Sequence, residues 1–246
     1  MGQYQYDNAF FAYTTASNDH SARRVSRWLV ATLNPRNVVD FGCAQGAWLA
    51  AWQQAGVQQV VGVDGDYVER AALRIDASAF LAHDLAQSID LGRQFEMVQS
   101  VEVGEHLPQT AAATFVQTLC RHGDVVLFSA APPGQGGEHH VNEQPYEYWR
   151  DLFARHGYAC FDCVRPQLRG DRGVAPWYRY NLFLYVKLDK VADLPAVVTA
   201  TRIADGGPMP DIAPLAYKVR KAAVRALPSA VADQLARLKA RWQRSR

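Results

Sequence analysis

The stretch VVDFGCAQGAWLAAW, residues 38–52, decides the fold class of this chain. It begins as an apolar strand, passes through a turn of small residues from Gly42 to Gly46, and continues with tryptophan and leucine at helical spacing. Glycine in such a turn permits unusual backbone angles and lets the backbone approach a ligand closely. The stretch therefore predicts a strand–turn–helix unit whose turn, with the free N–H groups of the helix start, faces a bound molecule.

Strands and helices alternate along the chain around this unit. The predicted helices are 21–33, 47–55, 67–73, 109–121 and 146–156, and the predicted strands are 38–41, 60–63, 80–82, 95–101, 125–129, 158–164 and 182–188. Such alternation predicts an α/β fold with a doubly wound, mostly parallel seven-stranded sheet and helices on both faces. The last two strands are joined by an irregular stretch rather than an obvious helix, so antiparallel pairing is open to them.

The sequence divides into one domain and an appendage. The domain is expected over residues 1–190, with an N-terminal helical lid to which Ser21–Arg24 would contribute. The composition of DGGPMPDIAP, residues 205–214, predicts a linker over 191–214. A short C-terminal helical appendage, a basic amphipathic tail, is expected over 215–246. Its second helix is expected to carry one apolar face, formed by Val231, Leu235, Leu238 and Trp242.

Charge is distributed unevenly between these parts. The chain carries a formal charge of +2, but residues 216–246 hold nine Lys or Arg against the single acid Asp233. Three interpretations of this tail are open: a solvated helical pair, docking on an anionic membrane surface or glycan-assembly partner, and nucleic-acid binding. Nucleic acid ranks last, because neither a base-reading motif nor an aromatic stacking sheet accompanies the charge.

The sequence favours a cytoplasmic protein, with peripheral contact at the inner face of the membrane as an option. The start MGQYQYDNAF has no signal-peptide pattern, and no apolar run is long enough to cross a membrane. The four cysteines fit a reducing compartment. Cys160 and Cys163 fall in a predicted strand, where this spacing points side chains to opposite faces, so we expect buried thiols.

The residues around the turn narrow the choice of ligand. No Gly-Lys-Ser/Thr follows, which excludes a P-loop, and the dinucleotide fingerprint G-x-G-x-x-G is absent. Asp64 lies about 20 residues further on, at the end of the next predicted strand, where an acid binds a ribose diol. These features fit an adenosine-containing ligand without a pyrophosphate.

Four motifs, in order, resemble those of the Rossmann-like (class I) S-adenosylmethionine (SAM)-dependent methyltransferases. VVDFGCAQG resembles their first motif, D-x-G-C-G-x-G, VVGVDG the second-strand motif, HDL at 83–85 the third-strand position, and FEMVQSVEVGEHLP the fourth-strand motif. FSAAPPGQGGEHHVNEQ (128–144) and WYRYN (177–181) are similar to runs in a bacterial subgroup associated with glycan biosynthesis. The resemblance covers roughly residues 20–190 and implies a Rossmann-like fold, methyl transfer and SAM as cofactor.

The resemblance implies which residues would bind the methionine part of SAM. Gly42, Cys43 and Gly46 would pass the backbone beneath it. Asp40 and Gln45 would order its amino group, directly or through water.

A second set of residues would bind the adenosine part. Asp64 would accept hydrogen bonds from both ribose hydroxyls, and Asp84, with the Leu85 backbone, would read the adenine edge. Ser100 would lie near the sulfonium. Each acid alone is equally well explained as a loop cap, but the placement of acids at three consecutive strand ends favours the binding role.

Two clusters at the same sheet edge offer a base for an oxygen acceptor. One spans residues 102–106 (EVGEH), and the other spans residues 138–143 (EHHVNE). The subgroup pattern favours His140 as general base, because it directly precedes Val-Asn-Glu-Gln. Glu105 or Glu143 would orient it or bind a substrate hydroxyl. The alternative is that His140 only pins its loop by hydrogen bonds.

A metal is an open question at this place. Glu102, Glu105, His106 and His140 resemble the two-Glu, two-His set of small-RNA 2′-O-methyltransferases, where a metal would hold both hydroxyls of a diol and lower the pKa of one. Many metal-free methyltransferases carry Glu-His-Leu here merely to shape the loop. We therefore expect Glu105 and His106 as catalytic residues beside His140 and assign no metal ligand, although a divalent metal stays open.

Together these features predict a SAM-dependent O-methyltransferase acting on a hydroxyl of a nucleotide sugar, a glycan or another small acceptor. The aromatic residues at 145–146 and 177–180 would stack on a sugar ring, with Arg179 on a phosphate, or would simply pack. Rival interpretations are a methyltransferase for a small phenol or RNA ribose, and a catalytically inactive SAM-binding partner protein. Ala44 favours the last, because it replaces the usual middle glycine and an alanine prefers a negative φ.

Overall fold

The structure is a computed structural model that describes residues 8–227 and residue 234, with side chains described from residue 18 onward. The predicted apolar face of Val231, Leu235, Leu238 and Trp242 therefore lies outside the described residues.

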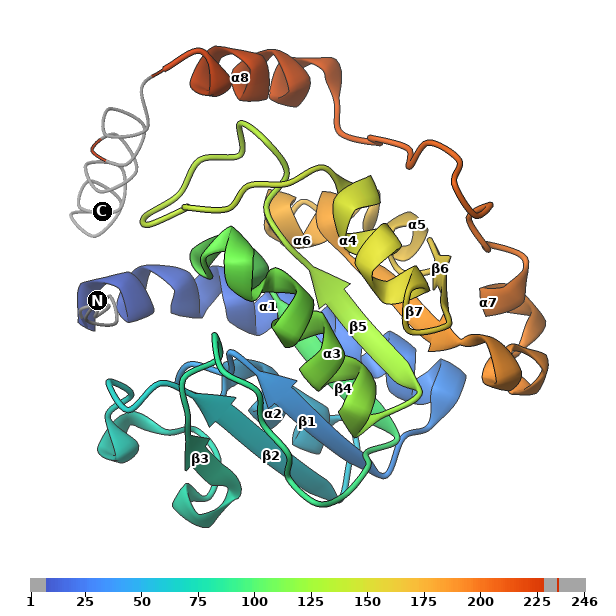
Figure 1. Ribbon diagram of the computed structural model, residues 1–246. Coiled ribbons are helices and arrows are strands. Elements are labelled where there is room, and N and C mark those ends of the chain that lie inside the picture. The colour runs from blue at the N-terminus through green and yellow to red at the C-terminus, as the bar shows by residue number, and fades with distance from the viewer. Residues whose placement is uncertain (1–7, 228–233, 235–246) are drawn as a thin grey trace.

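A seven-stranded sheet forms the centre of the described chain, in the order β3-β2-β1-β4-β5-β7-β6 (Figure 1). The strands are β1 (Asn37–Phe41), β2 (Gln59–Asp64), β3 (Phe80–Ala82), β4 (Met97–Val101), β5 (Val125–Ser129), β6 (Tyr158–Phe161) and β7 (Phe183–Lys187). Strands β1 to β5 pair in parallel, whereas β7 is antiparallel to both β5 and β6. The predicted mostly parallel, seven-stranded sheet is thus confirmed, including the antiparallel pairing of its last two strands.

Helices cover both faces of this sheet. The α-helices are α1 (Asn8–Leu33), α2 (Ala47–Gln54), α3 (Ala112–His122), α4 (Tyr146–Ala154), α5 (Arg165–Leu168), α6 (Pro176–Asn181), α7 (Ala196–Thr199) and α8 (Leu215–Arg225). Short 3₁₀ turns are η1 (Arg70–Ala72), η2 (Ala77–Ala79), η3 (Gly104–His106), η4 (Gln109–Ala111) and η5 (Leu188–Asp193).

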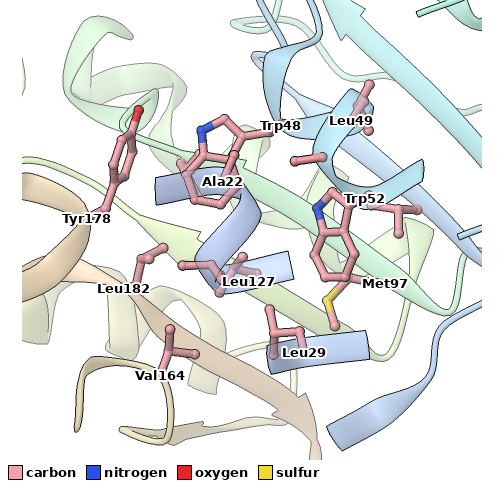
Figure 2. Close-up of a cluster of buried hydrophobic side chains, with 14 of the residues drawn as sticks. Ala22, Leu29, Trp48, Leu49, Trp52, Met97, Leu127, Val164, Tyr178 and Leu182 are labelled. Atoms are coloured by element: carbon pink, nitrogen blue, oxygen red, sulfur yellow. The ribbon is translucent and has the colours of Figure 1, made fainter. Parts of the chain in front are cut away.

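Two hydrophobic clusters lie on the two sides of the sheet. The first packs α1, α2 and α6 on one face, and Figure 2 shows Trp48 and Trp52 of α2 in this cluster together with Ala22 and Leu29 of α1. The second packs α3 and α4 on the other face, with Phe115 and Trp149 among its members. This is the layer arrangement that buries the apolar stripe of each helix.

Strand alternation explains how one sheet supplies both clusters. In β7, Leu184 and Val186 belong to the first cluster, and Phe183 and Tyr185 belong to the second. Cys160, on β6, and Cys163, just beyond it, divide in the same way, and both are buried free thiols as predicted.

The structure differs from the sequence prediction in three helical regions. The predicted helix 67–73 contains only the 3₁₀ turn η1. Helix α1 begins at Asn8 rather than at residue 21, because only its C-terminal half carries the apolar period on which the prediction relied. The stretch before β7, predicted to be irregular, contains α5 and α6. Each of these short helices has a proline at its first or second position, which is a helix-start signal that apolar periodicity does not register.

Residues 191–214 are held against the domain along their length. The backbone of Met209 donates to Glu147 on α4, and Arg165 donates to the carbonyl oxygen of Pro210. Figure 1 shows this segment running from α7 along the β6 side of the molecule to α8. The linker-like composition thus belongs to a strap that is fixed by hydrogen bonds at several points. Among the described residues, none of the helices combines the length and the hydropathy that a membrane-spanning segment requires.

The close approach of α2 to β2 yields a first prediction. A Cβ added at Gly62 would lie 2.7 Å from Cys43 Sγ and 3.0 Å from Leu49 Cδ1. We expect Gly62→Ala to lower the free energy of unfolding by about 1–3 kcal/mol, because the helix must shift away from the strand. Urea unfolding measures this, and Gly170→Ala, where the new methyl group meets open space, is the control. Equal stability of the two variants would contradict this packing.

Candidate active site

The turn between β1 and α2 has an alternating left-handed backbone. Gly42, Ala44 and Gly46 have φ values of +93°, +48° and +79°. A Cβ at Gly42 would lie 2.2 Å from Val103, so no larger residue fits there without movement. Gly46 caps α2 without any side-chain acceptor, which leaves the first N–H groups of this helix directed toward the turn.

Ala44 keeps the left-handed backbone angle that glycine would adopt. Because an alanine prefers a negative φ, the observed +48° strains the residue. Its N–H donates to Asp64 Oδ2 at 2.7 Å, which helps to hold the strained residue. The substitution therefore preserves the shape of the turn at a cost in backbone strain.

Asp64, the last residue of β2, is buried and already hydrogen-bonded. Besides Ala44 N–H, it accepts hydrogen bonds from Gly65 N–H and from the Tyr67 hydroxyl. Burial raises its pKa, and these hydrogen bonds oppose the rise. In this structure Asp64 thus acts as a support for the turn, and its predicted contact with ribose hydroxyls stays a prediction.

Two buried polar atoms at neighbouring strand ends have no hydrogen-bond partner among the described residues. They are Oδ1 of Asp40, on β1, and Oγ of Ser100, on β4. Burial raises the pKa of Asp40 to about 8, with Gln99 opposing the rise and Asp64 adding to it. Unsatisfied buried polar atoms are costly, so this pair fits a site that is completed by a polar ligand.

The other predicted cofactor residues take varied positions. Cys43 turns its side chain toward Gly62 and leaves its backbone in the turn. The carbonyl oxygen of half-buried Gln45 accepts from Arg74 N–H at 2.8 Å. Asp84, just after β3, is exposed and accepts from the backbone N–H two residues later, whereas Leu85 is buried. The three acids do lie at the ends of three adjacent strands, β1, β2 and β3, at one edge of the sheet.

The two predicted catalytic clusters are joined by hydrogen bonds to main-chain carbonyl oxygens. The oxygen of Glu105, in η3, accepts hydrogen bonds from Val141 N–H and Asn142 N–H at 2.9 and 3.0 Å. Asn142 also donates from its side chain to the Gly104 carbonyl oxygen at 3.2 Å. The β5–α4 loop (residues 130–145) is thereby fixed onto η3, which brings His140 beside Glu105 and His106.

Glu105, His106 and His140 form a compact group of potential ligands. Their carboxylate and imidazole atoms lie within 4.8 Å of one another. The side chain of Glu105 is completely buried, and neither of its oxygens has a hydrogen-bond partner among the described residues. Burial, and then repulsion from Glu102, raises its pKa well above the ordinary value. Burial lowers the pKa of His106 well below its ordinary value, with repulsion from His140 adding to the effect.

Each imidazole in this group is oriented through its Nδ1 atom. His106 Nδ1 lies 3.2 Å from the His139 carbonyl oxygen, and His140 Nδ1 lies 2.8 Å from Glu143 Oε1. Because these oxygens only accept hydrogen bonds, Nδ1 is the protonated nitrogen, and Nε2 carries the lone pair in each neutral ring. The rings meet edge to face with centroids 4.9 Å apart.

Glu143 organises the loop that carries His140. Its two oxygens also accept from Gly134 N–H and Gly136 N–H, each at 2.7 Å. Burial alone would raise the pKa of Glu143, but the hydrogen bond from His140 and those from the loop hold it below its ordinary value. Glu143 is therefore ionised at neutral pH and fixes the tautomer of His140.

Glu102 does not join this group, although the sequence placed it there. Its backbone has a φ of +56°, and its carboxylate accepts from Gln135 Nε2 at 2.6 Å and Asn181 Nδ2 at 3.2 Å. Asn181 also donates to Gln135 Oε1 and accepts from the Tyr146 hydroxyl. Sequence reasoning missed the roles of Gln135 and Asn181, since no spacing signal links the three side chains.

The aromatic run at 177–180 is partly accounted for by packing. Tyr178 is buried, with its ring 5.0 Å from that of Trp48. Tyr180 is buried against Tyr217 of α8, with ring centroids 5.3 Å apart. Arg179 donates to the Val174 carbonyl oxygen. For the two tyrosines, ordinary packing explains their positions better than a sugar platform does.

An α/β sheet with unpartnered polar atoms at its strand ends, beside a histidine–carboxylate pair, is an arrangement that suits an enzyme with a bound cofactor. A model of the methyltransferase-domain family matches residues 15–165. The chain belongs to this family and is a SAM-dependent methyltransferase with the Rossmann-like fold.

Solved structures of low sequence identity share the fold. DesVI from Streptomyces venezuelae matches with a TM-score of 0.55 at 14% identity, covering 75% of this chain and 100% of that one. The sugar N-methyltransferase KedS8 from Streptoalloteichus has a TM-score of 0.56 at 18% identity, with coverages of 76% and 95%. Magnesium protoporphyrin IX methyltransferase from Synechocystis, with bound SAH, has a TM-score of 0.51 at 19% identity. This match covers 76% of this chain and 90% of that one. No curated protein sequence matches the chain.

The strained turn yields a second prediction. We expect Ala44→Gly to raise the free energy of unfolding by up to about 1 kcal/mol, because the relief of a left-handed alanine exceeds the entropy that glycine adds to the unfolded chain. Urea unfolding tests this against Ala113→Gly, an exposed position in α3, which should lose about 0.5–1 kcal/mol. If both variants lose stability equally, Ala44 is not strained.

Proposed function

We propose that the protein transfers a methyl group from SAM to a hydroxyl oxygen of a sugar, with His140 as the base that takes the hydroxyl proton. The observation that carries this proposal is the 2.8 Å hydrogen bond between His140 Nδ1 and Glu143, beside buried Glu105. Such a pair fixes Nε2 as the proton acceptor and stabilises the ring once it is protonated.

The residues around the turn fit SAM. SAM supplies a methyl group that is already activated by a positively charged sulfur. Asp40 Oδ1 and Ser100 Oγ are buried acceptors without partners among the described residues, which suits the amino group and the region near the sulfonium. Gly42 and Gly46 let the backbone pass close beneath the ligand. Asp64 and Asp84 would bind the ribose and the adenine edge.

The acceptor side of the site is suited to a polar hydroxyl compound. Burial raises the pKa of Glu105 and so favours its protonated form, in which it would offer one O–H donor and one acceptor oxygen to a hydroxyl. His106 holds the adjacent wall of the site through its contact with the His140 ring. The similarity to a sugar N-methyltransferase supports a sugar as acceptor, and a base beside the site supports oxygen rather than an amine.

Transfer assays with labelled SAM test this proposal directly. The panel is a set of nucleotide sugars with free hydroxyls, matched amino sugars, simple phenols and RNA. Methylation of a hydroxyl sugar supports the proposal, and methylation of amino sugars alone overturns it in favour of nitrogen. RNA as the acceptor would show a steep loss of binding with salt. SAM binding without any transfer favours the inactive partner protein.

A third prediction concerns His140 itself. We expect His140→Ala to lower kcat by about 10²–10⁴-fold, because the proton acceptor is lost, while SAM binding measured by calorimetry stays unchanged. His140→Gln preserves side-chain hydrogen bonding but cannot take the proton, so it should be equally slow. Exposed His156→Ala is the matched control and should keep full activity. Recovery of activity in His140→Gln would mean that His140 only pins the loop.

A second candidate mechanism is favoured by the unpartnered carboxylate of Glu105. Two imidazoles and one carboxylate are donors that suit a divalent transition-metal ion, and Glu105, His106 and His140 would hold it. A bound ion would lower the pKa of a coordinated acceptor hydroxyl, which replaces the need for a free histidine base. Glu102 is excluded from the donor set because Gln135 and Asn181 occupy its carboxylate.

Metal titration separates the two mechanisms and forms a fourth prediction. If the group binds a metal, calorimetry of chelator-treated protein with Mn²⁺ or Zn²⁺ alone should show one site, which Glu105→Gln and His106→Ala remove and His156→Ala keeps. Methyl transfer that survives exhaustive chelation, with no binding of either ion, rejects the metal mechanism and leaves His140 as the base.

Nucleotide sugars and growing glycans carry hydroxyls of the required kind. We propose a cytoplasmic step of glycan assembly as the place of action. Nucleic acid is not proposed as a partner.

A further inference from the structure

Helix α8 has an inner face that rests on the β5–α4 loop. Arg220 Nη1 donates to the Gln135 carbonyl oxygen at 3.0 Å. A Cβ at Gly134 would lie 2.2 Å from the carbonyl oxygen of Lys221, so helix and loop are in direct backbone contact. Lys221 Nζ is bonded to Asp211 at 2.7 Å. Figure 1 shows α8 lying across this loop. The helix is therefore fixed in orientation, with one defined side facing out.

The outward side of α8 is apolar. Leu215 is 78% exposed and Val219 is 60% exposed, the two largest exposures among the exposed large hydrophobic side chains of the described chain. They lie one turn apart on the same side of the helix. The same stripe continues along exposed small residues, which are Ala222, Ala223 and Ala226. An apolar stripe of this length in solvent is typical of a surface that binds something.

Basic side chains accompany this stripe. Lys218 and Arg225 are exposed on α8. The sequence beyond the helix, residues 228–246, adds five Lys or Arg against the single acid Asp233. An apolar stripe with basic residues beside it is the pattern of a helix that lies in the interface of an anionic bilayer. Nucleic acid would use the basic residues but has no use for the exposed leucine and valine.

We propose that the outward face of α8, with Leu215 and Val219 at its centre, docks on an anionic phospholipid surface. The apolar side chains enter the headgroup boundary, and Lys218 and Arg225 contact lipid phosphates. Because the inner face of α8 touches Gly134 and Gln135, docking brings the loop that carries His140 close to the membrane surface. This inference does not depend on which acceptor is methylated.

Vesicle flotation of the full chain tests the proposal. Vesicles of phosphatidylcholine with phosphatidylglycerol, roughly three to one, should bind the protein, and pure phosphatidylcholine vesicles should bind it far less. The double variant Leu215→Glu/Val219→Glu should bind anionic vesicles at least about tenfold more weakly than the unaltered chain, because it removes the apolar stripe and adds negative charge. The control is Val197→Glu, the same change at a 49% exposed valine of α7, which should bind as the unaltered protein does.

Three results would overturn the proposal. The first is that the unaltered chain does not bind anionic vesicles. The second is that the double variant binds them as tightly as the unaltered chain, which assigns binding to residues outside α8. The third is that the chain binds yeast RNA but not vesicles, and that the double variant binds this RNA more weakly. SAM binding by calorimetry should be equal in all variants, which separates a loss of docking from a loss of fold and leaves the proposed methyl transfer to its own assay.

Discussion

Two backbone hydrogen bonds to the Glu105 carbonyl oxygen are the constraint on which the acceptor side of the site depends. They tie Val141 and Asn142 to a turn that directly follows β4. Together with the bond from the Asn142 side chain to Gly104 and the contact of His106 with the His139 carbonyl oxygen, they hold His140 in a fixed relation to the strand ends. With them, a histidine remote in sequence from Glu105 lies in the same small space, and its partner Glu143 is placed by the same loop. The position of His140 in the site thus depends on main-chain contacts as well as on side-chain ones.

Backbone strain is concentrated in the cofactor turn and around the His140 site. The described non-glycine residues with positive φ are Asn34, Ala44, Glu102 and His139. Asn34 follows the end of α1, where an asparagine adopts this conformation readily. The other three lie in the cofactor turn, after β4 and next to His140. Local hydrogen bonds compensate two of them, from Ala44 N–H to Asp64 and from Glu102 N–H to Ser129. Strain of this kind is commonly stored where a protein must position groups for function.

Much of this architecture could be predicted from local patterns. The strand ends carrying Asp40, Asp64 and Asp84 follow from apolar runs that stop at acids, and the parallel order follows from the alternation of elements. The clusters at 102–106 and 138–143 could be placed at one edge of the sheet because each follows a predicted parallel strand. These parts of the fold depend on short-range periodicity, which can be observed directly in the amino-acid sequence.

Other features depend on contacts that no periodicity encodes. The separation of Glu102 from Glu105 arises from one left-handed residue and from two amides, Gln135 and Asn181, that only the folded chain brings together. Asp64 is predicted to bind the ribose, but in the folded chain its carboxylate also accepts hydrogen bonds that support the turn at Ala44. This second role cannot be predicted from the sequence pattern. The strap over 191–214 has the composition of a linker. The hydrogen bonds that fix it are made by its backbone, and amino-acid composition does not predict such bonds.

The burial of Cys43 gives the cofactor turn a built-in reporter. Its thiol is enclosed against Gly62, and burial keeps its pKa well above the ordinary value, so little thiolate exists while the turn is closed. Thiol reagents attack the thiolate, so alkylation at Cys43 must wait for a local opening of the turn. The modification rate of this one cysteine therefore counts the openings of the turn, in a protein that needs no attached label.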